Sequence, residues 1–115
     1  MEGTKQKPIT QRMERGMRLW LFSQASCYIE YQQSDKAIVL LEAMRRLEPE
    51  NCDVHRMLSY GYLQVGKSEE SIRAADTFLK YAKPGTDTRA IRWIRGRARL
   101  RRKKQAANSQ AINNT

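Results

Sequence analysis

The sequence predicts an all-α fold, namely a short α-solenoid of two helix-turn-helix repeats followed by a C-terminal capping helix. When the chain is shifted along itself by 34 residues, chemically similar positions align, and this is the period of stacked helix-turn-helix units. The aligned pairs include Tyr28 with Tyr62, Ser34 with Ser68 and Ile38 with Ile72. The composition also favours helix, because it includes only 3 prolines and 6 glycines and hardly any β-branched runs.

A chain of 115 residues is expected to form one domain with one core. Residues 1–9 are polar, and Pro8 disfavours helix before Ile9, so we expect a flexible N-terminal arm there. The helical domain is expected over residues 10–104, with repeats at 18–51 and 52–85 and the capping helix at 87–104. The polar tail, residues 105–115, has no periodicity and is expected to be disordered.

The first predicted helix, from a cap at Thr10 to about Gln33, is apolar on several sides. The face expected to pack on its own repeat consists of Met17, Leu21, Ala25 and Tyr28. A second stripe holds Leu19, Phe22 and Ile29, and a third holds Trp20, Cys27 and Tyr31. The hairpin partner can cover only part of this surface, so something else must cover the rest.

The remaining helices have one apolar stripe each and clear start and stop signals. Ser34 and Ser68 are expected to cap the second and fourth helices, and Asn51 or Asp53 the third. Gly66 is expected to end the third helix through a left-handed turn. The fifth helix has a narrow apolar edge, which predicts that it covers the last repeat: Ala90, Ile91, Ile94 and Ala98.

The net charge of +10 is concentrated near the C-terminus. Residues 89–104 contain nine basic residues and no acidic one, while the rest of the chain holds 13 basic and 12 acidic residues. The run can be a solvated helix face, a contact for an acidic protein or a nucleic-acid contact. Nucleic acid is the least favoured, because Trp93 is the only aromatic residue in the run. The candidate electrostatic contacts are Arg56, Arg92, Arg97 and Arg101.

Neither a metal site nor an active site is predicted. Cys27 is expected to be a buried free thiol, and Cys52 with His55 provides too few ligands for zinc. His55 is the only histidine, and no nucleophile–base arrangement accompanies it, so we expect no enzyme and no cofactor. The start of the chain has no signal-peptide core, and the longest apolar run, residues 37–41, is too short for a membrane span. A cytoplasmic location is expected.

Across its two repeats the chain resembles the tetratricopeptide repeat (TPR) family. The landmarks in the first repeat are Ala25, Tyr28, Ala37, Leu41 and Pro49. Those in the second are Leu58, Ser59, Tyr62, Gly66, Ser71 and Phe78. The chain departs from the family pattern at Gln24, where an apolar residue is expected, and at Lys83, where proline is expected.

The resemblance implies a concave groove lined by the first helix of each pair and by the capping helix. By position, the partner-binding residues are Leu19, Phe22, Ser26, Ile29, Tyr60, Leu63 and Ile94, with Arg56, Ala90 and Arg97 beside them. The large apolar members exceed what the core of each repeat needs. They indicate a trough for an amphipathic helix or an extended apolar segment, unless the N-terminal arm or a second copy of the chain fills it.

Among small TPR proteins, the chain is most similar to the chaperones of bacterial type III secretion, in particular the Y component (SctY/YscY family). The points of likeness are the length, the second degenerate repeat and an apolar first helix directly before DKAIVLLEAMRRLEPEN. The resemblance implies a virulence-associated cytoplasmic chaperone for protein transport. It would bind a small early export substrate, the X component or a needle-type subunit, and help deliver it to the export gate. The basic C-terminal helix departs from this family. The alternatives are a general TPR adaptor, a nucleic-acid-associated protein that uses the basic helix, and an assembly protein that dimerises through its first helix.

Overall fold

The computed structural model describes residues 13–113 and shows five α-helices and no strand in that range. The all-α prediction is therefore confirmed. The helices are α1 (Arg15–Glu30), α2 (Ser34–Leu47), α3 (Cys52–Gln64), α4 (Ser68–Tyr81) and α5 (Arg89–Asn113). None of them is both long enough and apolar enough to cross a membrane.

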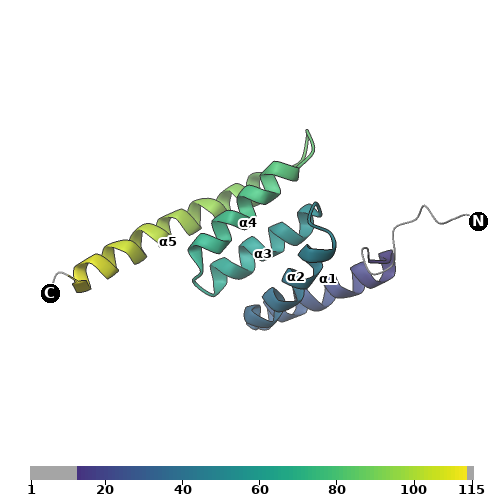
Figure 1. The fold of residues 1–115 in the computed structure, drawn as a ribbon, viewed down its shortest axis with the longest axis horizontal. Helices are drawn as coiled ribbons and strands as arrows, with labels where there is room; N and C mark the ends of the chain where they lie inside the picture. The colour runs from purple at the N-terminus through teal and green to yellow at the C-terminus, as the bar shows by residue number, and fades with distance from the viewer. Residues whose placement is uncertain (1–12, 114–115) are drawn as a thin grey trace, which may run out of the picture.

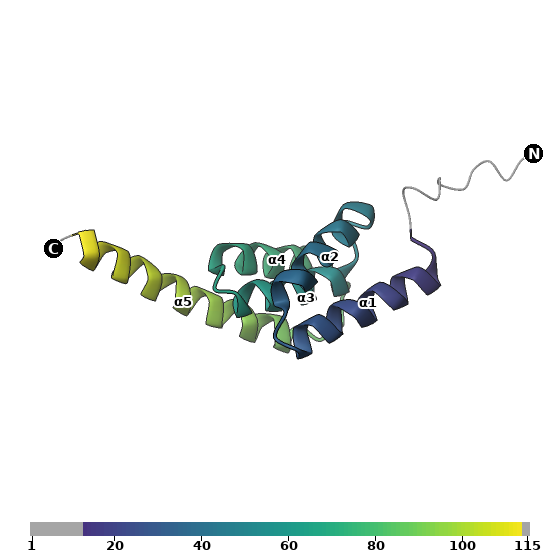
Figure 2. The same ribbon diagram turned by 90° about the horizontal axis from the view of Figure 1, so that it is seen from below.

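The helices form an elongated stack with extents of 70 × 31 × 23 Å (Figure 1). Each helix packs against the next one in the chain, and α5 also packs against α3. In Figure 2, α1 and α5 form the arms of a shallow V that extend in opposite directions, so the first turn of α1 and the last turn of α5 lie far apart. Apart from α3 with α5, the main contacts join consecutive helices, as expected where short connections link them.

Two hydrophobic clusters hold the stack together. The first joins α1, α2 and α3 around fully buried side chains, among them Ala25, Leu41 and Leu58. Gly61 belongs to this region: a Cβ atom there would lie 3.3 Å from Ile38 Cγ1, so α2 and α3 approach closely because glycine has no side chain. The second cluster joins α3 and α4 to α5. Its buried members are Leu63, Ile72, Ala75, Phe78, Ile91, Ile94 and Ala98.

The helix ends agree with the sequence at two places and differ at two others. Asn51 caps α3, and its side chain accepts a hydrogen bond from the Asp53 amide. Gly66 has a φ of 81°, as the predicted left-handed turn requires. Ser34 and Ser68, however, lie inside the first turns of α2 and α4 and do not cap them. Both are buried, so their hydroxyls bond instead to the side-chain oxygens of Gln64 and Gln105.

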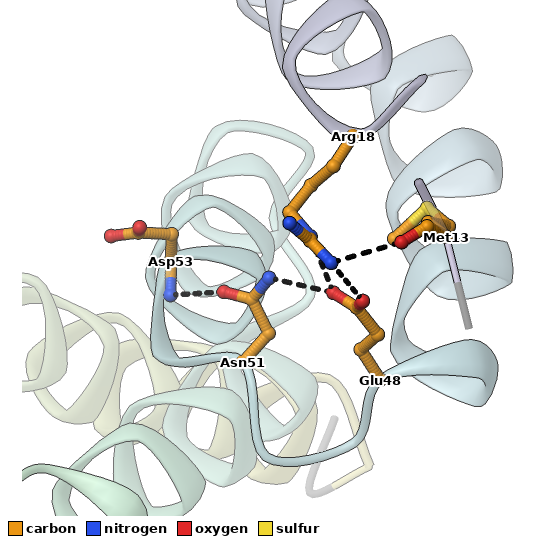
Figure 3. A network of polar contacts seen from close by, with 5 residues as sticks. All are labelled: Met13, Arg18, Glu48, Asn51 and Asp53. Carbon is orange, nitrogen blue, oxygen red and sulfur yellow. Dashed lines mark hydrogen bonds and ion pairs between the residues drawn. The ribbon is translucent and has the colours of Figure 1, made fainter. Parts of the chain in front are cut away.

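A partly buried ion pair joins α1 to the turn between α2 and α3 (Figure 3). Arg18 donates from Nε to Glu48 Oε1 over 2.8 Å and from Nη2 to Glu48 Oε2 over 2.5 Å. Its Nη2 also donates to the Met13 carbonyl, and Asn51 donates to Glu48 Oε1. The hydrogen bond to Glu48 raises the pKa of Arg18. The network joins the α1 end of the molecule to the Asn51 cap of α3.

The predicted boundaries need correction at the C-terminal end. The tail expected to be disordered from Gln105 is helical as far as Asn113, because α5 continues without a break beyond Lys104. Its sequence contains no proline or glycine after Gly96 and includes the good helix formers Gln and Ala. The predicted N-terminal arm and the Thr10 cap lie outside the described residues, and α1 is described only from Arg15.

Candidate partner-binding site

A hollow of about 490 Å³ opens between α1, α3 and α5. Its wall is almost entirely apolar, and Arg56 is the only charged residue among the described residues that line it. The lining residues are Ile29, Arg56, Met57, Tyr60, Ala90, Trp93 and Ile94.

Each helix presents one short face to this hollow. Ile29 comes from the last turn of α1. Met57 and Tyr60 are three positions apart on α3, and Trp93 and Ile94 lie one turn beyond Ala90 on α5, so the spacing of a helix places each set on one side. The packing of α5 against both α3 and α4 holds its face in place.

The structure brings together residues that the sequence analysis places in the groove from three separate helices. Ile29, Tyr60 and Ile94 all line the hollow, as do the neighbouring Arg56 and Ala90. Tyr60 is 37% exposed, whereas Ile94 is only 6% exposed and forms the floor where the hollow meets the second cluster.

Leu19, Phe22 and Ser26 do not line the hollow. Leu19 and Ser26 are exposed further along α1, and Phe22 is half-buried against the first cluster. Leu63 needs correction, because it is only 8% exposed and belongs to the second cluster. The C-terminal half of α3 is covered by α5, so Leu63 serves to hold α5 and is not a groove residue.

The sequence analysis missed Met57 and Trp93 as lining residues. Trp93 is 60% exposed, which makes it the most exposed aromatic ring at the hollow. A signal was present, since Ala90, Trp93 and Arg97 recur at the spacing of one helix face. Arg97 lies against the Trp93 ring, with its Cζ 5.8 Å from the ring centroid, a distance typical of a cation–π contact.

Most arginines of the basic run have partners within the chain. Arg95 pairs with Asp76, and Arg102 pairs with Glu69, so both hold α5 to α4. Arg101 donates to the Leu63 carbonyl over 2.5 Å and holds α5 to α3. Arg92 donates to Oγ1 of Thr88, the residue just before α5 begins. Several arginines of the run therefore stabilise the packing of α5 on α3 and α4.

The thiol and imidazole groups differ in exposure and in their hydrogen-bond partners. Cys27 is exposed on α1, which corrects the expectation of a buried thiol, because this side of α1 faces away from α2 and α3. Cys52 is half-buried, and burial raises the pKa of its thiol. His55 is buried, with Nε2 2.6 Å from the Pro49 carbonyl. Within residues 13–113 no group of three or more potential metal ligands occurs.

Comparison of the chain with protein-family models, curated proteins and solved structures finds no match to any of them.

Proposed function

We propose that the chain is a chaperone-type binding protein that holds an apolar helical segment of a partner in the hollow between α1, α3 and α5. The observation that carries this proposal is the wall of the hollow, in which six of seven side chains are uncharged. Trp93 and Tyr60 are 60% and 37% exposed, so both rings are free to contact a partner. Exposed aromatic side chains around an apolar recess are typical of protein–protein contacts.

The surface of α1 favours an elongated ligand. Leu19, Phe22, Ser26 and Ile29 recur at spacings of three and four, so they share one face of the helix. This face leads away from the hollow for about 15 Å, given the rise of 1.5 Å per residue. An amphipathic helix whose apolar side enters the hollow can continue along this face, a common way of recognising helical segments.

The charge around the hollow favours an acidic ligand. Arg56 lies in the wall and Arg97 lies beside Trp93. Within residues 13–113 the one acid paired with either is Asp53, whose Oδ1 lies 3.2 Å from Arg56 Nη2. A partner segment with acidic residues one turn from its apolar residues would be attracted by these groups. Such contacts mainly speed association and fix orientation.

The proposal extends to the type of fold and to the secretion system in which the chain acts. We take the chain to be a TPR-like α-solenoid that acts in the bacterial cytoplasm as a type III secretion chaperone. Its partner would be the X component or a needle-type subunit, which it keeps soluble and helps to deliver to the export gate. The residue resemblance supports this, and so does the packing of consecutive helices with α3 against α5, since stacked hairpins pack in this way.

A nucleic-acid role has less support. Five of the nine basic residues between residues 89 and 104 donate to groups of the chain itself: Arg89, Arg92, Arg95, Arg101 and Arg102. Four of the nine bond to acidic or backbone groups that a phosphate would have to displace or leave unpaired. We propose no catalytic role, because the imidazole of His55 is buried against a backbone carbonyl.

Two tyrosines of similar exposure provide the test. Tyr60 lies in the hollow and is 37% exposed, while Tyr81 lies on α4 outside it and is 40% exposed. The chain is co-expressed with the small export substrate of its own secretion system, and the amount of co-purified substrate is measured. We expect Tyr60→Ser to lose the substrate and Tyr81→Ser to retain it, with equal helicity by circular dichroism. Equal retention by both variants would contradict the proposed site.

A further inference from the structure

We call the hollow between α1, α3 and α5 the partner hollow. The side of α1 turned away from it carries a further apolar stripe. We name it the outer stripe: Met17, Trp20, Gln24, Cys27 and Tyr31. Its spacings are three, four, three and four, which is the pattern of the a and d positions of a heptad. The exposed fractions of Met17, Trp20 and Tyr31 are 54%, 61% and 75%. A helix seam of this kind is normally covered by another helix.

A hollow of about 380 Å³ adjoins the outer stripe where α1 meets α2. Val39 is 74% exposed at its edge, so α2 extends the apolar surface. The hollow shares no lining residue with the partner hollow. Its lining is Trp20, Gln24, Tyr28, Lys36, Val39 and Leu40.

The charge distribution permits a second copy of the same chain as the occupant. A net charge of +10 opposes self-association, but nine of the 22 basic residues lie between residues 89 and 104 on α5 and not on α1. Between residues 16 and 31 the charged residues are Arg18, which is bonded to Glu48, and Glu30. The outer stripe itself carries no charge, and Lys36 is the one charged side chain among the described residues that line the adjoining hollow, so two copies that meet there bring few like charges together.

The polar residue in the outer stripe also fits a helix pair. Gln24 is the middle member, and it departs from the TPR pattern because an apolar residue is expected there. A single polar residue at an a position specifies the register and the number of helices in a coiled coil. Pairing centred on this residue places Gln24 opposite Gln24 of the second copy, where the two amides can bond to each other.

The exposed apolar area can form the centre of a dimer interface. The exposed fractions of Trp20 and Tyr31 correspond to roughly 200–340 Å² per copy, taking 150–250 Å² for an aromatic side chain, and Met17 and Val39 add to this area. A standard interface buries ~800 Å² per partner, and the neighbouring polar side chains add to the total. Residues 1–12 offer only Met1 and Ile9 as apolar side chains, so their composition does not match this surface.

We propose that two copies of the chain pair through the outer stripe of α1 and the hollow beside Val39, leaving both partner hollows open. This inference stands on different residues from the proposed function. The resulting particle would present two partner hollows and carry two export substrates.

A matched pair of tryptophan variants tests the proposal, because Trp20 is 61% exposed and Trp93 is 60% exposed on different faces. The mass in solution is measured by analytical ultracentrifugation over a series of concentrations. We expect the wild-type chain and Trp93→Ser to have twice the single-chain mass of 13.4 kDa. Trp20→Ser is expected to dissociate, with the dimer constant weakened at least about tenfold.

Other results would overturn the proposal. A wild-type monomer at all concentrations would do so, including one that dimerises only after removal of residues 1–12, because those residues would then cover the stripe. A Trp20→Ser dimer as tight as the wild type would also do so, and Val39→Ser repeats the test on α2. If Trp20→Ser is monomeric while Trp93→Ser still binds the export substrate, the dimer stands and the proposed partner site fails.

Discussion

Ser59 on α3 and Ser71 on α4 each donate a hydroxyl hydrogen bond to the backbone carbonyl of the other, over 2.8 and 2.7 Å. Both residues are 0% exposed. Two small side chains allow the helices to approach closely, and the reciprocal bonds leave neither hydroxyl without a partner. The pair fixes how α3 lies on α4, and Tyr60, the next residue on α3, is thereby aimed at the partner hollow.

We predict that Ser59→Leu destabilises the fold by about 1–3 kcal/mol, because the added carbons have no space between the two helices. Ser59→Ala removes one hydrogen bond without overpacking, and its cost is about 1 kcal/mol. Urea unfolding followed by circular dichroism measures both. A leucine variant as stable as the alanine variant would show that the contact is looser than described.

Stability at alkaline pH is predicted to depend on Tyr62. Burial, together with the hydrogen bond of 2.6 Å that its hydroxyl donates to Glu42, raises the pKa of Tyr62 above its ordinary value of 10.0. The unfolded chain therefore releases this proton first, and the free energy of unfolding falls as the pH rises above about 10. Melting temperatures between pH 8 and 11 should fall more steeply for the wild type than for Tyr62→Phe. Parallel curves would contradict the raised pKa.

Stability at acid pH is predicted to depend on Glu42, the carboxyl partner of Tyr62, and to fall as the pH falls. Burial alone would raise the pKa of Glu42, but the hydrogen bonds from Tyr62 and Arg45 lower it below its ordinary value of 4.5. The stability from this carboxylate is therefore present above pH 4.5 and is lost as the pH falls through the lowered pKa. Glu42→Gln should flatten the fall in melting temperature below pH 4.5. The measurement is the difference between the two melting curves from pH 6 to 3.

The ion pair between Arg18 and Glu48 is predicted to contribute to the free energy of unfolding. The side chain of Glu48 is 7% exposed, so loss of the two hydrogen bonds from Arg18 in Arg18→Met should cost about 1–3 kcal/mol. The double variant Arg18→Met/Glu48→Met is expected to cost less than the sum of the two single variants, because both remove the same contact. A double-mutant cycle in urea measures the coupling. Additive effects of the two single variants would contradict the assigned pairing.

Two truncations are predicted to show that the first half of α5 stabilises the fold and that its C-terminal end does not. Ile91, Ile94 and Ala98 are buried in the second cluster, so a chain that ends after Thr88 should expose that cluster and lose cooperative melting. A chain that ends after Ala106 keeps the hydrogen bonds that Gln105 accepts from Ser68 and donates to the Gly66 carbonyl. It should therefore melt like the full chain. Differential scanning calorimetry compares the two. A large loss of stability in the chain that ends after Ala106 would show that residues 107–115 contribute to the fold.

Much of the fold could be predicted because it is local in sequence. The 34-residue period and the glycine and proline signals locate four helices and three turns, and Asn51 and Gly66 act as expected. The predicted caps at Ser34 and Ser68 are wrong, because their hydroxyls bond to glutamines that lie 30 and 37 residues further along the chain. Only tertiary packing determines such pairs.

The residues that line the hollow follow from the sequence where the helix face alone decides their position, and not where packing decides it. Ile29, Tyr60 and Ile94 meet at the hollow as their positions indicate. Leu63 is covered because α5 lies on α3, a contact that no local pattern contains. Trp93 was overlooked because it stands in a run of arginines, whose charge dominates the reading of that segment.

The central claim is that a partner segment occupies the hollow at Trp93, and the fluorescence of that residue tests it most directly. The chain has 2 tryptophans, so Trp20→Phe leaves Trp93 as the only indole and Trp93→Phe provides the control. Trp93 is 60% exposed in the free chain. On binding of the export substrate, Trp93 emission should shift to shorter wavelength in Trp20→Phe, because the ring becomes buried. An unchanged emission maximum in a sample that demonstrably binds the substrate would contradict the account.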